Sequence, residues 1–140
     1  MLKMKLAAVL AAFALGSAQA AELVVIVSVR TPVMALRGDQ VAGIFLAEVS
    51  SFPEGGEAVA VDQGVGSPLR DEFYQKVANR SPALMKAYWT KMIFTGRGQP
   101  PREAPGSVAV RRLVADNPGM IGYIERAALD PSVRPVLVLK

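Results

Sequence analysis

The sequence predicts an α/β fold with a largely parallel sheet and helices on its faces. The first observation behind this prediction is Glu22 to Ser28, a nearly continuous run of β-branched residues typical of a strand buried on both sides. The second is that later apolar runs of strand length alternate with segments in which apolar residues recur at helical spacing. Strands separated by helices favour a layered arrangement with parallel strands.

Residues 1–20 have the features of a secretory signal peptide. Two lysines precede an apolar run from Leu6 to Gly16, and Ala18 and Ala20 are the small residues of an A-x-A cleavage site. The run is shorter than a membrane span requires, and no cysteine follows it for lipid attachment. We therefore expect cleavage after Ala20, export to the periplasm, and one domain over residues 21–140.

Composition narrows the classes of function. The formal net charge is +4, and part of it lies on the two signal-peptide lysines, so charge gives no reason to expect a nucleic-acid partner. The chain has no cysteine for disulfides and no histidine, which is the commonest general base and metal ligand. Its acidic residues show no metal-ligand spacing. We expect no enzyme activity, no metal and no cofactor.

The later elements are predicted from periodicity and turn residues. In chain order they are a helix over 38–48, a strand over 58–61, a helix from Ser67, a helix over 81–94, an exposed loop over 95–101, a helix from Ser107, and strands over 120–124 and 136–139. The helix over 81–94 has a wide apolar stripe, so Trp89 and Phe94 are expected in the core. Gly122 inside a strand suggests the close approach of another backbone.

The stretch from Gln63 to Arg70 is the main candidate for a binding site. It combines the end of a strand, Gly64 and Gly66 in a turn, and Ser67 as the N-cap of a helix whose first residue is proline. The free amides of a helix N-terminus can hold an anion. The alternative is a strand-to-helix connection that needs glycine only for its backbone angles.

Two further residues are candidates, one because of its place in a parallel sheet and the other because it lies in an exposed loop. Carboxyl ends of parallel strands share one edge, so Ser28 at the end of the first strand is expected beside the Gln63–Arg70 turn. Arg97 lies in the glycine- and proline-rich loop over 95–101, and exposed loops often carry function.

Four motifs resemble those of the phosphate-type periplasmic substrate-binding proteins. Gln40–Leu46 resembles the family's L-x-x-I-F-x-G helix, Phe52–Gly56 its W-x-D-G turn, Val61–Arg70 occupies the place of its R-x-D-G-S-G-T phosphate motif, and Asn117–Ile124 resembles its x-P-G-A-I-G-Y-V strand. The order and spacing match over roughly residues 23 to 126. The resemblance implies one lobe of a type II periplasmic-binding-protein-like fold, in three layers with a mostly parallel sheet.

The chain departs from that family in two respects. A full family member has two lobes and more than twice this length, and it traps its ligand between them. In the phosphate motif, the family's Arg, Asp, Gly, Ser, Gly and Thr correspond by position to Gln63, Val65, Gly66, Ser67, Pro68 and Leu69. The arginine that would clamp phosphate is therefore missing from its place. Arg70, Arg30 or Arg97 could supply a positive charge instead.

Two functions remain open. The first is a solute-binding protein of the phosphate ABC transporter type, which takes phosphate or another small oxyanion and meets a transporter permease. Its ligand-binding residues would be Gln63, Gly64, Gly66, Ser67, Arg70, Ser28 and Arg97. The second is a single-lobe accessory or sensor module that interacts with another envelope protein. In either case a homodimer could rebuild a cleft between two lobes. A nucleophilic role for Ser67 is disfavoured because the chain has no histidine to activate it.

Overall fold

The structure of the protein is a computed structural model that describes residues 22–140. The predicted signal peptide over residues 1–20 and its cleavage after Ala20 lie outside these residues. Among residues 22–140, no helix combines the length and the apolar content needed to cross a membrane.

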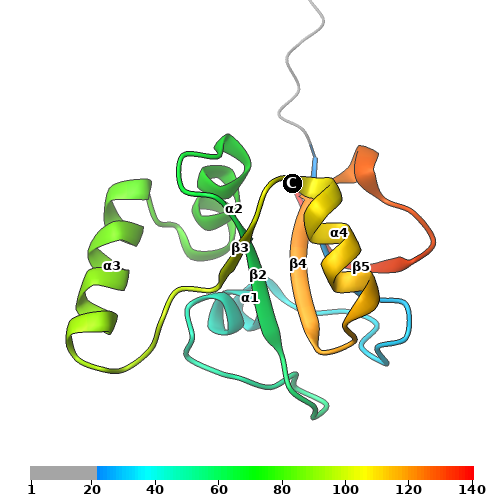
Figure 1. The fold of residues 1–140 in the computed structure, drawn as a ribbon, viewed down its shortest axis with the longest axis horizontal. Coiled ribbons are helices and arrows are strands. Elements are labelled where there is room, and N and C mark those ends of the chain that lie inside the picture. The colour runs from blue at the N-terminus through cyan, green and yellow to red at the C-terminus, as the bar shows by residue number, and fades with distance from the viewer. Residues whose placement is uncertain (1–21) are drawn as a thin grey trace, which may run out of the picture.

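Five strands form one sheet in the order β3-β2-β4-β1-β5 (Figure 1). They are β1 (Leu23–Ser28), β2 (Val59–Gln63), β3 (Arg102–Ala104), β4 (Met120–Glu125) and β5 (Val133–Leu139). β2 pairs in parallel with β3 and β4, whereas β1 pairs antiparallel with both β4 and β5. Four strands therefore run in one direction and β1 alone opposes them. The predicted mostly parallel α/β sheet is confirmed, but its first strand is reversed.

Helices cover the two faces of the sheet. They are α1 (Gly38–Phe45), α2 (Pro68–Ala78), α3 (Pro82–Phe94), α4 (Ser107–Asp116) and the 3₁₀ turn η1 (Arg126–Ala128). Alternate side chains of β1 point to opposite faces, as strand geometry requires. Val25 and Val27 join a large apolar cluster with α1 and α2, whereas Val24 and Ile26 pack against α4. The result is the three-layer arrangement seen in Figure 1, with α4 on one face and α1 and α2 on the other.

Gly122 lets α4 lie close to β4. A Cβ added at Gly122 would be 2.5 Å from Cγ1 of Val110 and 3.2 Å from Cγ2 of Val114, both on α4. The nearest backbone atom outside the strand's own neighbours is the carbonyl oxygen of Val61, at 3.6 Å. The close approach predicted at this glycine therefore exists, but it is made mainly by valine side chains rather than by another backbone.

Helix α3 stands at the end of the molecule beyond the short edge strand β3 (Figure 1). Met85 and Trp89 are buried, so the prediction that Trp89 belongs to the core is confirmed. The prediction for Phe94 is wrong, because this side chain is 87% exposed. The reason is position: α3 lies beyond the sheet edge, so only one of its faces has a neighbour.

Candidate functional site

The turn between β2 and α2 has the geometry of a helix N-terminus open to solvent. The amide of Ser67 donates to the carbonyl oxygen of Gly64 over 3.0 Å, which closes the turn. Gly66 has φ of +90°, a conformation that side-chain-bearing residues avoid. The Ser67 hydroxyl oxygen then accepts from the amide of Arg70 over 3.4 Å, and Pro68 occupies the first helical position. The predicted strand, glycine turn and capped helix are thus all present.

This turn leaves backbone donors without partners. Within residues 22–140, the amides of Gly66 and Leu69 donate no hydrogen bond to the protein. A helix cannot satisfy the amides of its own first turn, and the helix dipole adds partial positive charge there. Two free amides beside the Ser67 hydroxyl are therefore suited to a small anion.

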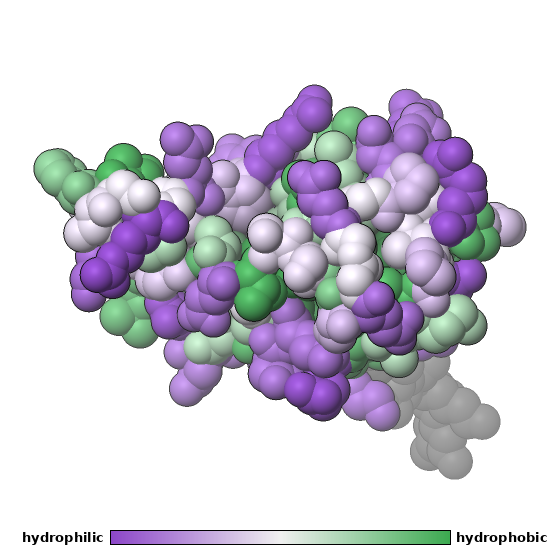
Figure 2. All heavy atoms as spheres, turned by 90° about the horizontal axis from the view of Figure 1, so that it is seen from below, coloured by the Kyte–Doolittle hydropathy of each residue, from purple (hydrophilic) through white to green (hydrophobic). Residues whose placement is uncertain are grey.

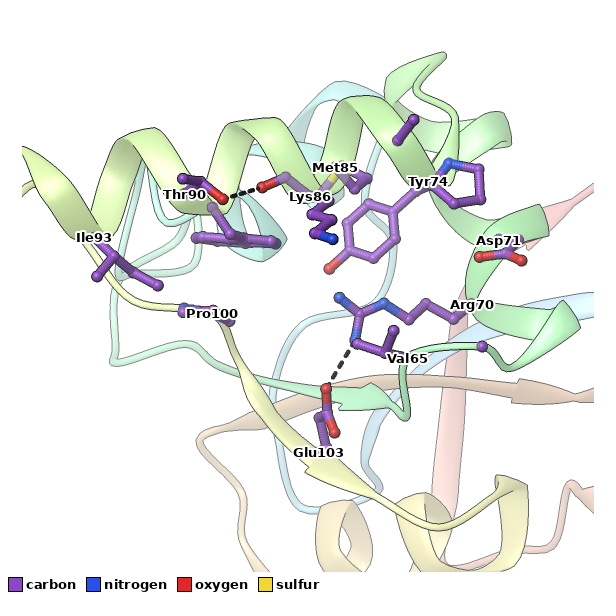
Figure 3. A pocket seen from close by; sticks show the side chains of 14 residues that line it. Val65, Arg70, Asp71, Tyr74, Met85, Lys86, Thr90, Ile93, Pro100 and Glu103 are labelled. Carbon is purple, nitrogen blue, oxygen red and sulfur yellow. Dashed lines mark hydrogen bonds and ion pairs between the residues drawn. The ribbon is translucent and has the colours of Figure 1, made fainter.

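A cleft of about 590 Å³ opens beside the turn (Figure 3). One wall is the apolar side of α3, with Met85, Trp89 and Ile93. The other wall comes from the start of α2 and from β3, and it contributes polar groups including Arg70 and Glu103. The volume falls within the range of small-molecule sites, and Gly66 lies on the rim of the cleft.

Arg70 points into the cleft but its charge is already paired. One guanidinium nitrogen, Nη1, donates to Oε1 of Glu103 over 3.0 Å and to the carbonyl oxygen of Gln63 over 3.1 Å. The same nitrogen lies 3.8 Å from Oδ2 of Asp62. Burial alone lowers the pKa of Arg70, but the nearby carboxylates, above all that of Asp62, raise it overall. The guanidinium therefore stays charged and is held by two acids rather than offered to a ligand.

Asp62 is fully buried at the centre of a polar cluster that the sequence analysis did not identify. Its carboxylate accepts from the hydroxyl of Tyr74 over 2.5 Å, from the hydroxyl of Tyr123, and from the amide of Gln63 over 2.8 Å. Burial raises the pKa of Asp62, and the bonds from Tyr123 and Tyr74 and the charge of Arg70 offset only part of that rise. The cluster ties β2, β4 and α2 together behind the turn. A lone aspartate inside an apolar strand was the available signal, since buried acids require partners.

Solved structures of other proteins share this fold. A protein from Clostridium perfringens described as a phosphate ABC transporter substrate-binding protein, with bound phosphate, matches with a TM-score of 0.64 and 27% identity over 82% of this chain. An ABC-type phosphate transport receptor from Vibrio cholerae matches at 0.65 with 18% identity, also over 82%. PstS from Borrelia burgdorferi matches at 0.59 with 12% identity over 85%. The resemblance to the phosphate-type substrate-binding family is confirmed.

The chain spans less than half of each of these phosphate-type proteins. It covers 44% of the Clostridium protein, 45% of the Vibrio protein and 46% of the Borrelia protein. These neighbours are transport binding proteins rather than enzymes. No protein-family model matches the sequence, and no curated protein does.

Gln63 and Gly64 make contacts that stabilise the protein itself. Gln63 is 2% exposed, and its side-chain amide donates to the carbonyl oxygen of Tyr123 over 3.2 Å and to the hydroxyl of Ser107 over 3.4 Å. Its side chain is therefore directed into the protein, away from the open turn. Gly64 supplies the carbonyl that closes the turn. Of the predicted residues, Gly66 and Arg70 line the cleft, and Ser67 lies between them in the chain as the N-cap of α2.

The structure separates Ser28 and Arg97 from the other predicted residues. The expectation that Ser28 shares an edge with the turn is wrong, because β1 is antiparallel to β4 while β2 is parallel to it. Ser28 lies at the other end of the strands from the turn, where it is fully buried. Its hydroxyl donates to the carbonyl oxygen of Ala115 over 3.1 Å. Arg97 is exposed in the loop after α3 and does not line the cleft.

No group of three or more acidic side chains within residues 22–140 has the arrangement of a metal site. The polar groups that border the cleft are instead a guanidinium, a lysine, two carboxylates, hydroxyls and amides. Of these groups, the backbone amide of Gly66 is a donor that the protein leaves free for an anion.

Proposed function

We propose that the chain is an exported relative of the phosphate-type substrate-binding proteins that binds a small oxyanion at the N-terminus of α2. The observation that carries the proposal is the pair of unpartnered amides, Gly66 and Leu69, on either side of the N-cap residue Ser67. Gly66 lines the cleft, whereas Leu69 lines a separate hollow with Gly106 and Ser107. The phosphate bound in the Clostridium relative supports an anion of this kind. A location in the periplasm and a permease partner belong to the same proposal.

The electrostatics predict weak binding. The nearest buried cation, Arg70, is neutralised by Asp62 and Glu103, so the amides and the helix dipole carry most of the attraction. Contributions of this size give a dissociation constant nearer to millimolar than to micromolar, which corresponds to a binding free energy of about −4 kcal/mol. A second protein that covers the cleft would exclude water and strengthen the same contacts.

Titration calorimetry of residues 21–140 with phosphate and sulfate tests the proposal. The chain supplies a matched pair of variants, because Ser81 caps α3 as Ser67 caps α2, each followed by proline and each accepting from the amide three residues on. Both Ser67→Ala and Ser81→Ala should cost about 1 kcal/mol of stability. Only Ser67→Ala should weaken the binding of the anion. Absence of heat with either anion at millimolar concentration, or equal loss in both variants, contradicts the proposal.

A second candidate function is an accessory or sensor module that meets another envelope protein without a transport ligand. The inward direction of Gln63 and the pairing of Arg70 favour it, since both residues are occupied by the protein itself. Light scattering after size-exclusion chromatography, followed by crosslinking in the envelope, tests this candidate. A strictly monomeric protein without any crosslinked partner contradicts it, and a homodimer would indicate that two copies form the cleft together.

A further inference from the structure

Helix α3 is apolar around its circumference, although only one of its faces is covered. Met85 and Trp89 are buried against the body of the protein. The opposite face exposes 87% of Phe94, and at its borders Leu84 and Ile93 are each 56% exposed. A helix that is apolar on all sides is normally buried on all sides. The uncovered face of α3 therefore exposes apolar side chains where a solvent-facing helix would carry polar ones.

The outer face of α3 has a defined shape. A shallow hollow of about 630 Å³ runs along it, lined by Ala83, Lys86, Ala87, Thr90, Lys91 and Phe94. At 3.6 residues per turn, the small residues and Phe94 fall along the middle of this face. Figure 2 shows apolar surface crossed by hydrophilic side chains at the end of the molecule that α3 forms.

Positive charges flank the middle row of this face. Lys86 and Lys91 stand on either side of the middle row, and α3 contains no acidic residue. Both lysines are exposed, and within residues 22–140 neither forms a salt bridge. The apolar row is thus bordered by positive charge along both of its sides.

Shape and charge together select one kind of occupant. Ala83, Ala87, Thr90 and Phe94 follow at intervals of four, three and four residues, the spacing of a seam between two helices. Ala83, Ala87 and Thr90 are small enough to permit the close approach of another helix, and the flanking lysines complement carboxylates. We propose that the outer face of α3 docks a helix of a different protein, one that carries Asp or Glu on both sides of an apolar ridge.

A second copy of the chain fits this face less well. Two parallel α3 helices in contact would place Lys86 beside Lys91 of the other copy, and two antiparallel ones would place each lysine on the same side as its own counterpart. Like charges in such positions oppose association. An anionic lipid surface also fits less well, because Phe94 is the one large apolar side chain in the middle of the face. Alanine and threonine contribute little to insertion into lipid.

This docking surface goes beyond anion binding, although it adjoins the cleft. The hollow and the cleft share Ala83, Lys86 and Thr90 as lining residues. A docked helix would therefore stand beside the mouth of the cleft without touching the amides of the α2 N-terminus. The two proposals rest on different atoms and can fail separately.

Fluorescence anisotropy with two synthetic helical peptides tests the docking surface. Both peptides share one ridge of leucine and alanine; one carries glutamate on each side of the ridge and the other carries lysine. We expect the glutamate peptide to bind about tenfold more tightly, with a difference that shrinks as salt is added. The double variant Lys86→Glu/Lys91→Glu should reverse the preference. Arg112→Glu, an exposed cation on α4, should leave it unchanged.

Several outcomes would overturn the inference. Equal binding of the two peptides, no binding of either, or an unchanged preference in the double variant each contradict it. A dimer that Phe94→Ala disperses would show that a second copy is the occupant. Tighter binding to anionic phosphatidylglycerol vesicles than to the glutamate peptide would show a lipid surface. Ser67→Ala should leave peptide binding intact, so failure of the anion site remains distinguishable.

Discussion

Replacing Gly122 with alanine measures how tightly α4 is packed on β4. The new Cβ would lie 2.5 Å from Cγ1 of Val110, whereas carbon atoms in contact prefer about 3.5–4.0 Å. Helix α4 or the valine must therefore retreat by about 1 Å. Overpacking of this kind costs about 1–3 kcal/mol, and alanine recovers about 0.5–1 kcal/mol because glycine weakens a strand. The expected net loss is about 1–2 kcal/mol in the free energy of unfolding.

Urea denaturation followed by the fluorescence of Trp89 provides the assay. The midpoint should fall while the slope stays constant, because the surface exposed on unfolding does not change. The melting temperature should fall by about 3–8 °C. Gly38→Ala is the matched control, since its added Cβ meets nothing within 4 Å, and it should change stability by less than about 0.5 kcal/mol.

A double variant identifies the contact responsible. Val110→Ala removes the atom that clashes, so it should cost less in the Gly122→Ala protein than in the wild type. If the two losses simply add, the clash between residues 110 and 122 is not the cause and the reasoning is refuted. Unchanged stability of Gly122→Ala itself would refute it more directly.

Three further predictions concern the polar cluster behind the turn. Tyr74→Phe should lower the free energy of unfolding by about 1–3 kcal/mol, because the buried Asp62 loses a hydrogen-bond donor; thermal denaturation measures it. Because the fold raises the pKa of Asp62, this residue's favourable contribution is complete below its unfolded pKa of about 3.9 and is lost as pH rises through the folded pKa. The free energy of unfolding of the wild type relative to that of Asp62→Asn should therefore decline as pH rises above about 3.9, measured by urea titrations at stepped pH. A difference that stays constant with pH would contradict a raised pKa for Asp62. Glu103→Gln should strengthen phosphate binding about two- to fivefold in calorimetry, because Arg70 loses one of its two acids; unchanged or weaker binding would show that Arg70 does not reach the anion.

The sequence predicted the layers and most elements because each has a strong local signal. The β-branched run of β1 and the serine–proline starts of α2 and α3 depend on residues close in the chain. The direction of β1 has no such signal. A strand buried on both faces reads the same whether its neighbours run parallel or antiparallel, so only the pairing with β4 and β5 decides it.

The candidate site was predicted in part for the same reason. The glycine turn and the capped helix are local, and the structure contains them where they were expected. The side chains of Gln63 and Arg70 are held by hydrogen bonds to Tyr123, Ser107 and Glu103. These partners are distant in the chain and adjacent only in the fold. Ser28 was misplaced because its position follows from strand direction. Phe94 was misplaced because composition cannot show that a helix lies beyond the edge of a sheet.

The reversed strand β1 also governs the order in which the molecule can form. Leu23 is paired on one side with Glu125 and on the other with Leu139, so the strand at the start of the fold completes its pairing only with the last residues of the chain. Closing loops of this length makes sheet formation slow and nearly all-or-none. Until β4 and β5 are both present, β1 lacks at least one partner and the sheet is incomplete, although β2 and β3 can already pair. The first strand of the fold is therefore among the last to be fully paired.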